Sequence, residues 1–187
     1  MGQYYHPVSL EKKSYVSSHD FDNGLKLMEH SYIGNKFVNA VEQLIAKGGN
    51  WFGDRIVWAG DYADPELNDD GSISEKNLVD LCEDRIKPQI DKIKYFRFLV
   101  NRTKKEFVDL SKVPVCDTHH WKDDNGKIHT TFYKIHPLPL LTCEGNGRGG
   151  GDYHGKSNLI GSWARDVIQP QTKKPKGEFK EIIFTLV

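Results

Sequence analysis

A glycine-rich segment, residues 143–155 (CEGNGRGGGDYHG), is the part of the chain whose residue types most strongly suggest chemistry. Six of its thirteen residues are glycine, and glycine is costly to order unless the backbone needs positive φ or a close approach. Successive backbone N–H groups can form an anion-binding nest, and Arg148 can bind a phosphate or carboxylate with both arms of its guanidinium. We therefore predict an anion-binding loop, with a flexible or bulged surface loop as the alternative. Its predicted binding residues are Gly147, Arg148, Gly149 and Gly150.

Ionisable side chains in and near this loop are candidates for catalysis. Asp152 and His154 can supply acid–base chemistry beside the nest, and Glu144 lies in the same segment. Asp61 lies just after an expected strand at residues 55–59, and a strand end is a rigid platform for a side chain. The segment lacks the Gly-Lys-Ser/Thr ending of a P-loop, and no Gly-x-Ser-x-Gly elbow is present, so nucleophilic catalysis has no support.

The segment HDFDNG near the N-terminus concentrates metal-ligand side chains. His19, Asp20 and Asp22 are of the types that a divalent metal accepts, which makes such a metal the candidate cofactor. The alternative is a turn in which aspartate and asparagine side chains bond to the backbone before a helix begins. Three histidines flank a later hairpin and could bind zinc, but Cys116 is the only soft ligand nearby, and hairpin histidines are mostly exposed side chains. They are His119, His120 and His129.

Basic residues alternate with aromatic ones in the second half of the chain. Lys104 and Lys105 belong to this set and are further candidates for binding. On a sheet, such a mixture can stack bases and hold phosphates, and the alternative is an ordinary exposed sheet surface. The other members include Lys92, Lys94, Tyr95, Arg97, Arg102, Trp121, Tyr133 and Lys134.

Hydrophobic periodicity predicts the elements that must position these residues. Helical spacing and capping residues predict helices over residues 36–47 (capped by Asn35), 72–86 (a capping box at Ser72 and Glu75) and 158–168. Alternating or continuous apolar residues predict strands at 3–9, 13–18, 55–59, 95–100, 106–110, 137–143 and 181–187, and on both sides of KDDNGK. Asn125-Gly126 in that last hairpin predicts a type I′ turn. The fold class expected is α+β, with a mainly antiparallel sheet built from hairpins and two main helices in the N-terminal half.

Composition bounds the class of protein. The 187 residues predict a single globular domain over 1–187, and the four Trp, eight Tyr and nine Phe exclude a disordered chain. No apolar run approaches the roughly 20 residues that span a bilayer, and no signal-peptide pattern is present. Three widely spaced cysteines fit a reducing compartment, so we expect a cytoplasmic protein with no membrane partner.

The formal net charge of zero conceals an asymmetry between the two halves of the chain. Residues 1–90 carry 9 Lys or Arg and 15 Asp or Glu, a balance of −6. Residues 91–187 carry 17 and 11, a balance of +6. The chain therefore has either one acidic and one basic face, or a surface on which the charges mix after folding.

Several segments resemble a family of small uncharacterised proteins found in Firmicutes and in their phages and mobile elements. They are MGQYY, HDFDNGLKLMEHSYIGN, VWAGDYAD, HPLPLLTCEGNGRGGGDYHG and GSWARDVI. The resemblance implies a role in conflict between phage and host, a setting in which small accessory proteins include anti-CRISPR inhibitors of RNA-guided nucleases. It supplies no catalytic residues.

The leading hypothesis is therefore an inhibitor of a type II nuclease that acts on the complex of nuclease protein and guide RNA. The first alternative is a metal-assisted hydrolase or nuclease that gathers its acidic, histidine and arginine side chains in one pocket. The second is a protein that binds a nucleotide or phosphate ligand. The residues of the hydrolase hypothesis are His19, Asp20, Asp22, Asp61, Asp152, His154 and Arg148.

Overall fold

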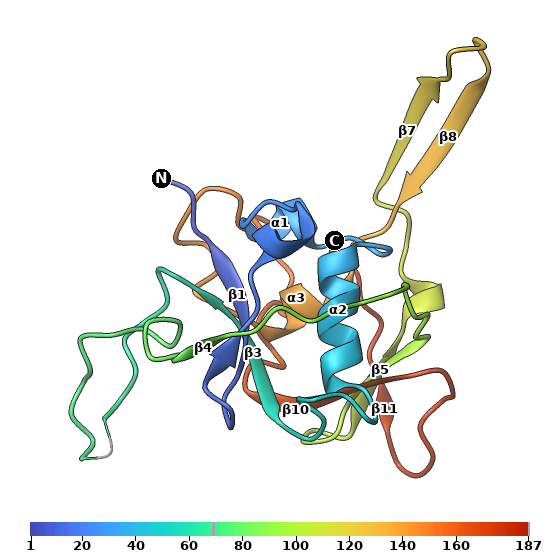
Figure 1. Cartoon of the computed structure of the whole chain (residues 1–187). Helices are drawn as coiled ribbons and strands as arrows, with labels where there is room; N and C mark the ends of the chain where they lie inside the picture. The colour runs from blue at the N-terminus through green and yellow to red at the C-terminus, as the bar shows by residue number, and fades with distance from the viewer. Residues whose placement is uncertain (69, 187) are drawn as a thin grey trace.

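The computed structural model of the chain describes residues 1–68 and 70–186. Across these residues, nine strands form one mostly antiparallel sheet, ordered β11-β6-β5-β10-β3-β1-β2-β4 with β9 beside β3 (Figure 1). Their bounds are β1 Tyr5–Ser9, β2 Ser14–Tyr15, β3 Arg55–Gly60, β4 Asp84–Arg85, β5 Phe98–Asn101, β6 Glu106–Asp109, β9 Cys143–Glu144, β10 Asp166–Gln171 and β11 Lys180–Glu181. The pairs β11 with β6, β2 with β4 and β3 with β9 are parallel. This sheet agrees with the predicted α+β class.

Three α-helices lie within the described residues: α1 (Leu27–His30), α2 (Lys36–Ile45) and α3 (Pro137–Thr142). Helix α2 begins as predicted, because the Asn35 side chain accepts hydrogen bonds from the N–H groups of Phe37 (2.9 Å) and Val38 (3.2 Å). Two short 3₁₀ turns, η1 (Ser18–Phe21) and η2 (Leu110–Lys112), complete the helical elements described. No helix of the described residues is long and apolar enough to cross a lipid bilayer.

Strand β3 lies at the centre of the core, as its β-branched and aromatic sequence predicts. Ile56, Val57 and Trp58 are fully buried. Successive side chains of a strand point to opposite faces, so Ile56 and Trp58 join the large cluster that includes α2 and α3. Val57 joins a smaller cluster with Val8 on the other face. Burial on both faces explains why β3 is continuously apolar after its exposed first residue, Arg55.

The helix predicted over residues 72–86 is wrong, and with it the prediction of two main N-terminal helices. Backbone bonds to distant strands replace the helical ones: Glu83 N–H donates to Lys13 O (3.1 Å), and Ile86 N–H donates to Tyr15 O (2.9 Å). The Asn77 side chain also accepts from Asp80 N–H (3.0 Å), as a cap or turn residue does. Pairing with the sheet edge therefore takes the backbone groups that the helix would have used.

The apolar run at 137–143 forms helix α3 rather than the predicted strand. Pro137 occupies its first position, where a missing N–H is harmless, and His136 Nδ1 caps it by accepting from Leu138 N–H (3.2 Å). All six residues of α3 are buried, so its sequence shows no amphipathic period that would distinguish it from a buried strand.

Residues 158–168 turn and then enter β10, so the helix predicted there is also wrong. Gly161 (φ +71°) and Arg165 (φ +64°) have left-handed backbones that interrupt any helix. The N–H groups of Gly161 and Trp163 donate to the carbonyls of Leu140 and Leu141 (2.8 and 2.7 Å). Of the strand predicted at 181–187, only Glu181 is in a strand, as the last residue of β11, and position 187 lies outside the described residues.

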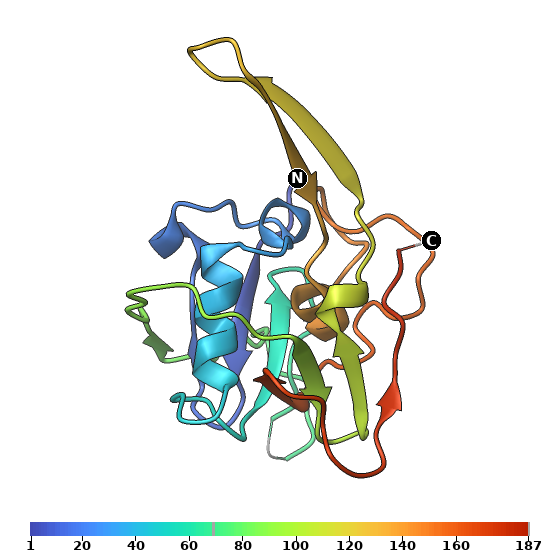
Figure 2. The same ribbon diagram turned by 90° about the vertical axis from the view of Figure 1, so that its right-hand side faces the viewer.

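Strands β7 (Asp117–Lys122) and β8 (Ile128–Tyr133) pair only with each other and form a two-stranded ribbon. Figures 1 and 2 both show this ribbon extending away from the rest of the molecule. The hairpin was predicted, but its turn was not. Gly126 N–H donates to Asp123 O (2.9 Å) and Gly126 has φ +77°, whereas Asn125 is not among the described residues with positive φ. This is a type I turn followed by a left-handed glycine, since a type I′ turn needs two positive φ angles.

Candidate functional site

The glycine-rich loop forms the predicted nest of backbone N–H groups, but the anion in it belongs to the chain itself. Asp152 Oδ2 accepts from the N–H groups of Gly147 (2.7 Å), Arg148 (2.9 Å) and Gly149 (3.0 Å). Its Oδ1 accepts from the hydroxyl of Tyr5 (2.9 Å), and the carboxylate is buried. Burial and the neighbouring Asp152 charge raise the pKa of Tyr5 well above its ordinary value, so the phenol stays protonated and donates. Asp152 therefore anchors the loop and is not positioned for acid–base work on a ligand.

The glycines allow this loop to pack closely against the N-terminal segment. Gln3 N–H donates to Gly150 O (3.1 Å), and Gly150 N–H donates to Met1 O (3.0 Å). A Cβ on Gly149 would lie 2.8 Å from the backbone nitrogen of Gln3, closer than real side chains approach. Gly145 combines φ +87° with a backbone neighbour, Ala63 N, 3.1 Å from where its Cβ would lie. The glycine content thus serves a close approach of backbone to backbone.

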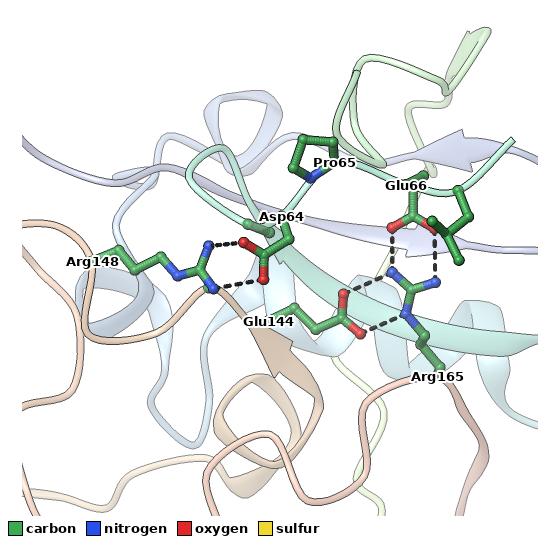
Figure 3. Close-up of a pocket in the computed structure, with 9 residues that line it drawn as sticks. Asp64, Pro65, Glu66, Glu144, Arg148 and Arg165 are labelled. Carbon is green, nitrogen blue, oxygen red and sulfur yellow. Dashed lines mark hydrogen bonds and ion pairs between the residues drawn. The ribbon is translucent and has the colours of Figure 1, made fainter. Parts of the chain in front are cut away.

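A polar pocket of about 550 Å³ lies beside this loop, and it brings together two of the predicted residues, Glu144 and Arg148 (Figure 3). Arg148 binds Asp64 with both arms of its guanidinium (2.7 and 2.8 Å) and also donates to Tyr62 O (2.8 Å). These bonds and the Arg148 charge lower the pKa of Asp64. An anionic ligand would have to displace Asp64 to reach Arg148.

The second guanidinium of the pocket, Arg165, lies between two carboxylates (Figure 3). It donates to both oxygens of Glu144 (2.6 and 2.9 Å) and to both oxygens of Glu66, one of them at 2.9 Å. Hydrogen bonds to the two carboxylates raise the pKa of Arg165 above its ordinary value. Glu144 is therefore held as an ion-pair partner, and its geometry does not resemble that of a free general acid or base.

Replacing Arg165 with alanine should lower the free energy of unfolding by about 2 kcal/mol, because two carboxylates would face each other without their shared cation. The matched control is Arg148→Ala, whose partner Asp64 is 80% exposed and whose loss should cost less than about 1 kcal/mol. Urea denaturation of both variants measures the difference. Equal effects of the two substitutions would contradict the structural role assigned to Arg165.

None of the remaining predicted catalytic and binding residues is among those that line this pocket. Asp61 Oδ1 accepts from Tyr4 N–H (2.9 Å), and His154 is exposed. Lys104 forms an ion pair with Asp166 (3.5 Å) and donates to Ser162 O, while the ammonium of Lys105 lies 5.3 Å from the ring centre of Phe179. Asp61, Lys104 and Lys105 thus bond to or pack against other parts of the chain and stabilise local structure.

The metal candidates are also engaged elsewhere. Asp20 pairs with Arg85 (2.9 Å) and Lys87 (3.5 Å). Asp22, with φ +56°, ends η1 as a left-handed cap, and the Asn23 side chain donates to Phe21 O (2.7 Å), as expected of a turn. Across residues 1–68 and 70–186, no group of three or more His, Cys, Asp or Glu side chains is arranged to hold a metal. His19, Asp20 and Asp22 therefore do not form such a group.

The ribbon carries functional candidates that the sequence interpretation undervalued. Directly opposite residues share a face, so Ile128 and Phe132 lie on one side and Trp121 and Tyr133 on the other. Ile128 is 63% and Phe132 is 64% exposed. Trp121 stacks on His129 (4.5 Å between ring centres), yet remains 46% exposed. The sequence did carry a signal for this: large apolar residues occupy positions on both faces of the hairpin. A hairpin that packs against the body on one side needs apolar residues on that face only.

Fold and site together define a mixed α/β protein with a mostly antiparallel sheet, a loop locked around its own carboxylate, and a projecting aromatic ribbon. Comparison with family models, curated proteins and solved structures finds no match to this chain.

Proposed function

We propose that this protein acts by binding a protein partner through the β7–β8 ribbon. The observation that carries the proposal is that both faces of the projecting ribbon present large apolar side chains to solvent. A two-stranded ribbon with no third strand is marginally stable in water, and exposed apolar patches usually mark interaction sites. Contact with a partner would bury Ile128, Phe132, Trp121 and Tyr133. It would thereby remove their apolar surface from water and stabilise the ribbon.

The chemistry of the ribbon favours a protein cleft over a nucleic-acid backbone as its binding site. Residues 117–133 contain three aspartates and two lysines, whereas contact with phosphates requires an excess of positive charge. Because both faces carry apolar residues, a flat surface would cover only half of them. A groove with apolar walls on two sides fits the ribbon best.

The resemblance to mobile-element proteins supplies the proposed target, a type II RNA-guided nuclease bound to its guide RNA. Binding in a cleft of the nuclease protein would block cleavage without any chemistry by the inhibitor. The internal bonds of Asp152, Glu144 and Arg148 support binding over hydrolysis, since an active site needs its acid, base and charge-stabilising groups available to a substrate.

Shortening the ribbon should abolish inhibition and leave the body folded. Cys116 N–H donates to Tyr133 O (2.8 Å), so an Asn-Gly turn can replace residues 117–132 and close the hairpin at that pair. In a DNA-cleavage assay over a panel of type II nucleases, we expect the potency of the shortened chain to fall by about 100-fold or more, as expected when several anchoring side chains are lost.

Point variants make the same test with less change to the chain. Ile128→Ser combined with Phe132→Ser should reduce potency by at least about tenfold. The matched control is Ile73→Ser, a 73% exposed isoleucine on the body, which should leave potency unchanged. Full potency of the shortened chain would refute the role of the ribbon. Unchanged cleavage by every nuclease at large excess of the native chain would refute the target.

A further inference from the structure

A second pocket, of about 400 Å³, lies between α2, the segment 93–96 and the root of the ribbon. Its volume falls within the range of small-molecule sites, which are mostly apolar with a few fixed polar groups. The apolar walls come from Ile33, Ile93, Phe96 and Leu110. None of the catalytic or metal-binding candidates lines it.

The polar part of the lining is a buried hydrogen-bonded group, Glu42 with His136 and Asn39. His136 Nδ1 accepts from Leu138 N–H, so the ring proton is on Nε2, which donates to Glu42 Oε1 (3.2 Å). Asn39 Nδ2 donates to Glu42 Oε2 (2.9 Å). Each oxygen of a carboxylate can accept more than one hydrogen bond, so Glu42 retains acceptor capacity toward a ligand.

Side chains of α2 hold the outer wall of this pocket in place. The Asn39 amide accepts from Lys94 N–H (2.9 Å) and donates to Lys94 O (2.7 Å), as a neighbouring strand would. Gln43 Nε2 donates to Lys92 O (3.2 Å) one turn further along. Asn39 therefore fixes both the carboxylate and the wall opposite it, which preorganises the pocket.

Two lysines, Lys94 and Lys134, complete the lining. Neither forms an ion pair with any side chain in the described part of the chain. The pocket thus combines apolar walls, a buried acceptor and two lysines that lack an acidic partner.

The geometry points to a binding site for a small heteroaromatic anion. Its ring would lie between the apolar walls, a ring N–H would donate to Glu42, and a carboxylate or phosphate would pair with Lys94 and Lys134. This inference is independent of the ribbon and of any nuclease target.

Calorimetric titration with matched probes tests each part of the inference. Indole-3-acetate has the ring, the N–H and the anion; indole lacks the anion, and 1-methylindole-3-acetate lacks the N–H. We expect indole-3-acetate to bind, and each of the other two to bind at least about tenfold more weakly, a loss of one interaction. Guanosine 5′-monophosphate, with a ring N–H and a phosphate, distinguishes a phosphate from a carboxylate ligand.

Lysine variants identify the site without disturbing the core. Lys94→Ala removes only the side chain, because Asn39 binds the Lys94 backbone, and it should weaken indole-3-acetate about tenfold or more. Lys92→Ala is the control: this exposed lysine lies on the same segment but outside the pocket lining, and its loss should change affinity little. Absence of binding by both indole-3-acetate and guanosine 5′-monophosphate at millimolar concentration would overturn the inference. Equal weakening by the two variants would overturn it as well.

Discussion

Substitution of Asp152 by alanine should lower the free energy of unfolding by about 3 kcal/mol, among the largest effects expected from a single side chain of this fold. The Asp152 carboxylate satisfies the N–H groups of Gly147, Arg148 and Gly149 together with the Tyr5 hydroxyl. Its removal leaves four donors without their acceptor. Part of the loss is recovered because the loop lies at the surface and water can reach some of its N–H groups.

Urea denaturation of two variants measures this effect against a smaller one. Tyr5→Phe removes a single donor to Asp152 and should cost about 1 kcal/mol. Asp152→Ala should lower the urea concentration at the unfolding midpoint about three times as much as Tyr5→Phe, with a similar dependence of the unfolding free energy on urea. A change below about 0.5 kcal/mol for Asp152→Ala would show that the loop does not depend on its internal anion.

Acidification from pH 6.5 to pH 4 should remove about 3 kcal/mol of stability through His30 alone. His30 is fully buried; its Nδ1 bonds to Gly24 O (3.0 Å), and its Nε2 accepts from Trp58 Nε1–H (3.0 Å). Burial lowers the pKa of His30 to about 4. The folded state therefore favours the neutral ring, and its contribution is complete above the unfolded pKa and is lost as pH falls toward 4. Burial lowers the pKa of His6 as well, which acts in the same direction.

Urea midpoints between pH 7 and pH 4 test this prediction, with His30→Gln as the comparison. The variant will be less stable at pH 7, but its stability should fall less steeply over this range. Asp109 titrates in a separate, more acidic window, because Arg97 lowers the pKa of Asp109 to about 2. Identical slopes for the native chain and the variant would exclude His30 as the group responsible.

Elements with a local signal were predicted from the sequence. Asn35 caps α2, β3 is apolar after Arg55, and polar turns separate the strands of both hairpins. Each signal depends on residues within a few positions of one another, which is the range over which propensity and periodicity act. Elements set by distant partners were missed: residues 83–86 bond to the β2 region, and the turns at 161–165 bond to α3 and β3.

The features of the candidate site can also be separated into those with a local signal in the sequence and those set by distant partners. Six glycines around Arg148 indicated an anion nest, and the nest exists, because backbone conformation follows from local residue type. That Asp152 occupies the nest and also accepts from the Tyr5 hydroxyl, 147 positions away in the sequence, is known only from the fold. The sequence by itself therefore determined the features with a local signal: the cap of α2, the apolar strand β3, the positions of both hairpins and the anion nest. The tertiary structure decided that Arg148 pairs with Asp64 and that Glu42 lines a pocket, because these contacts join side chains that lie far apart along the chain and leave no local pattern. It also decided that no other strand pairs with the ribbon in the described part of the chain, because that depends on where the rest of the chain folds.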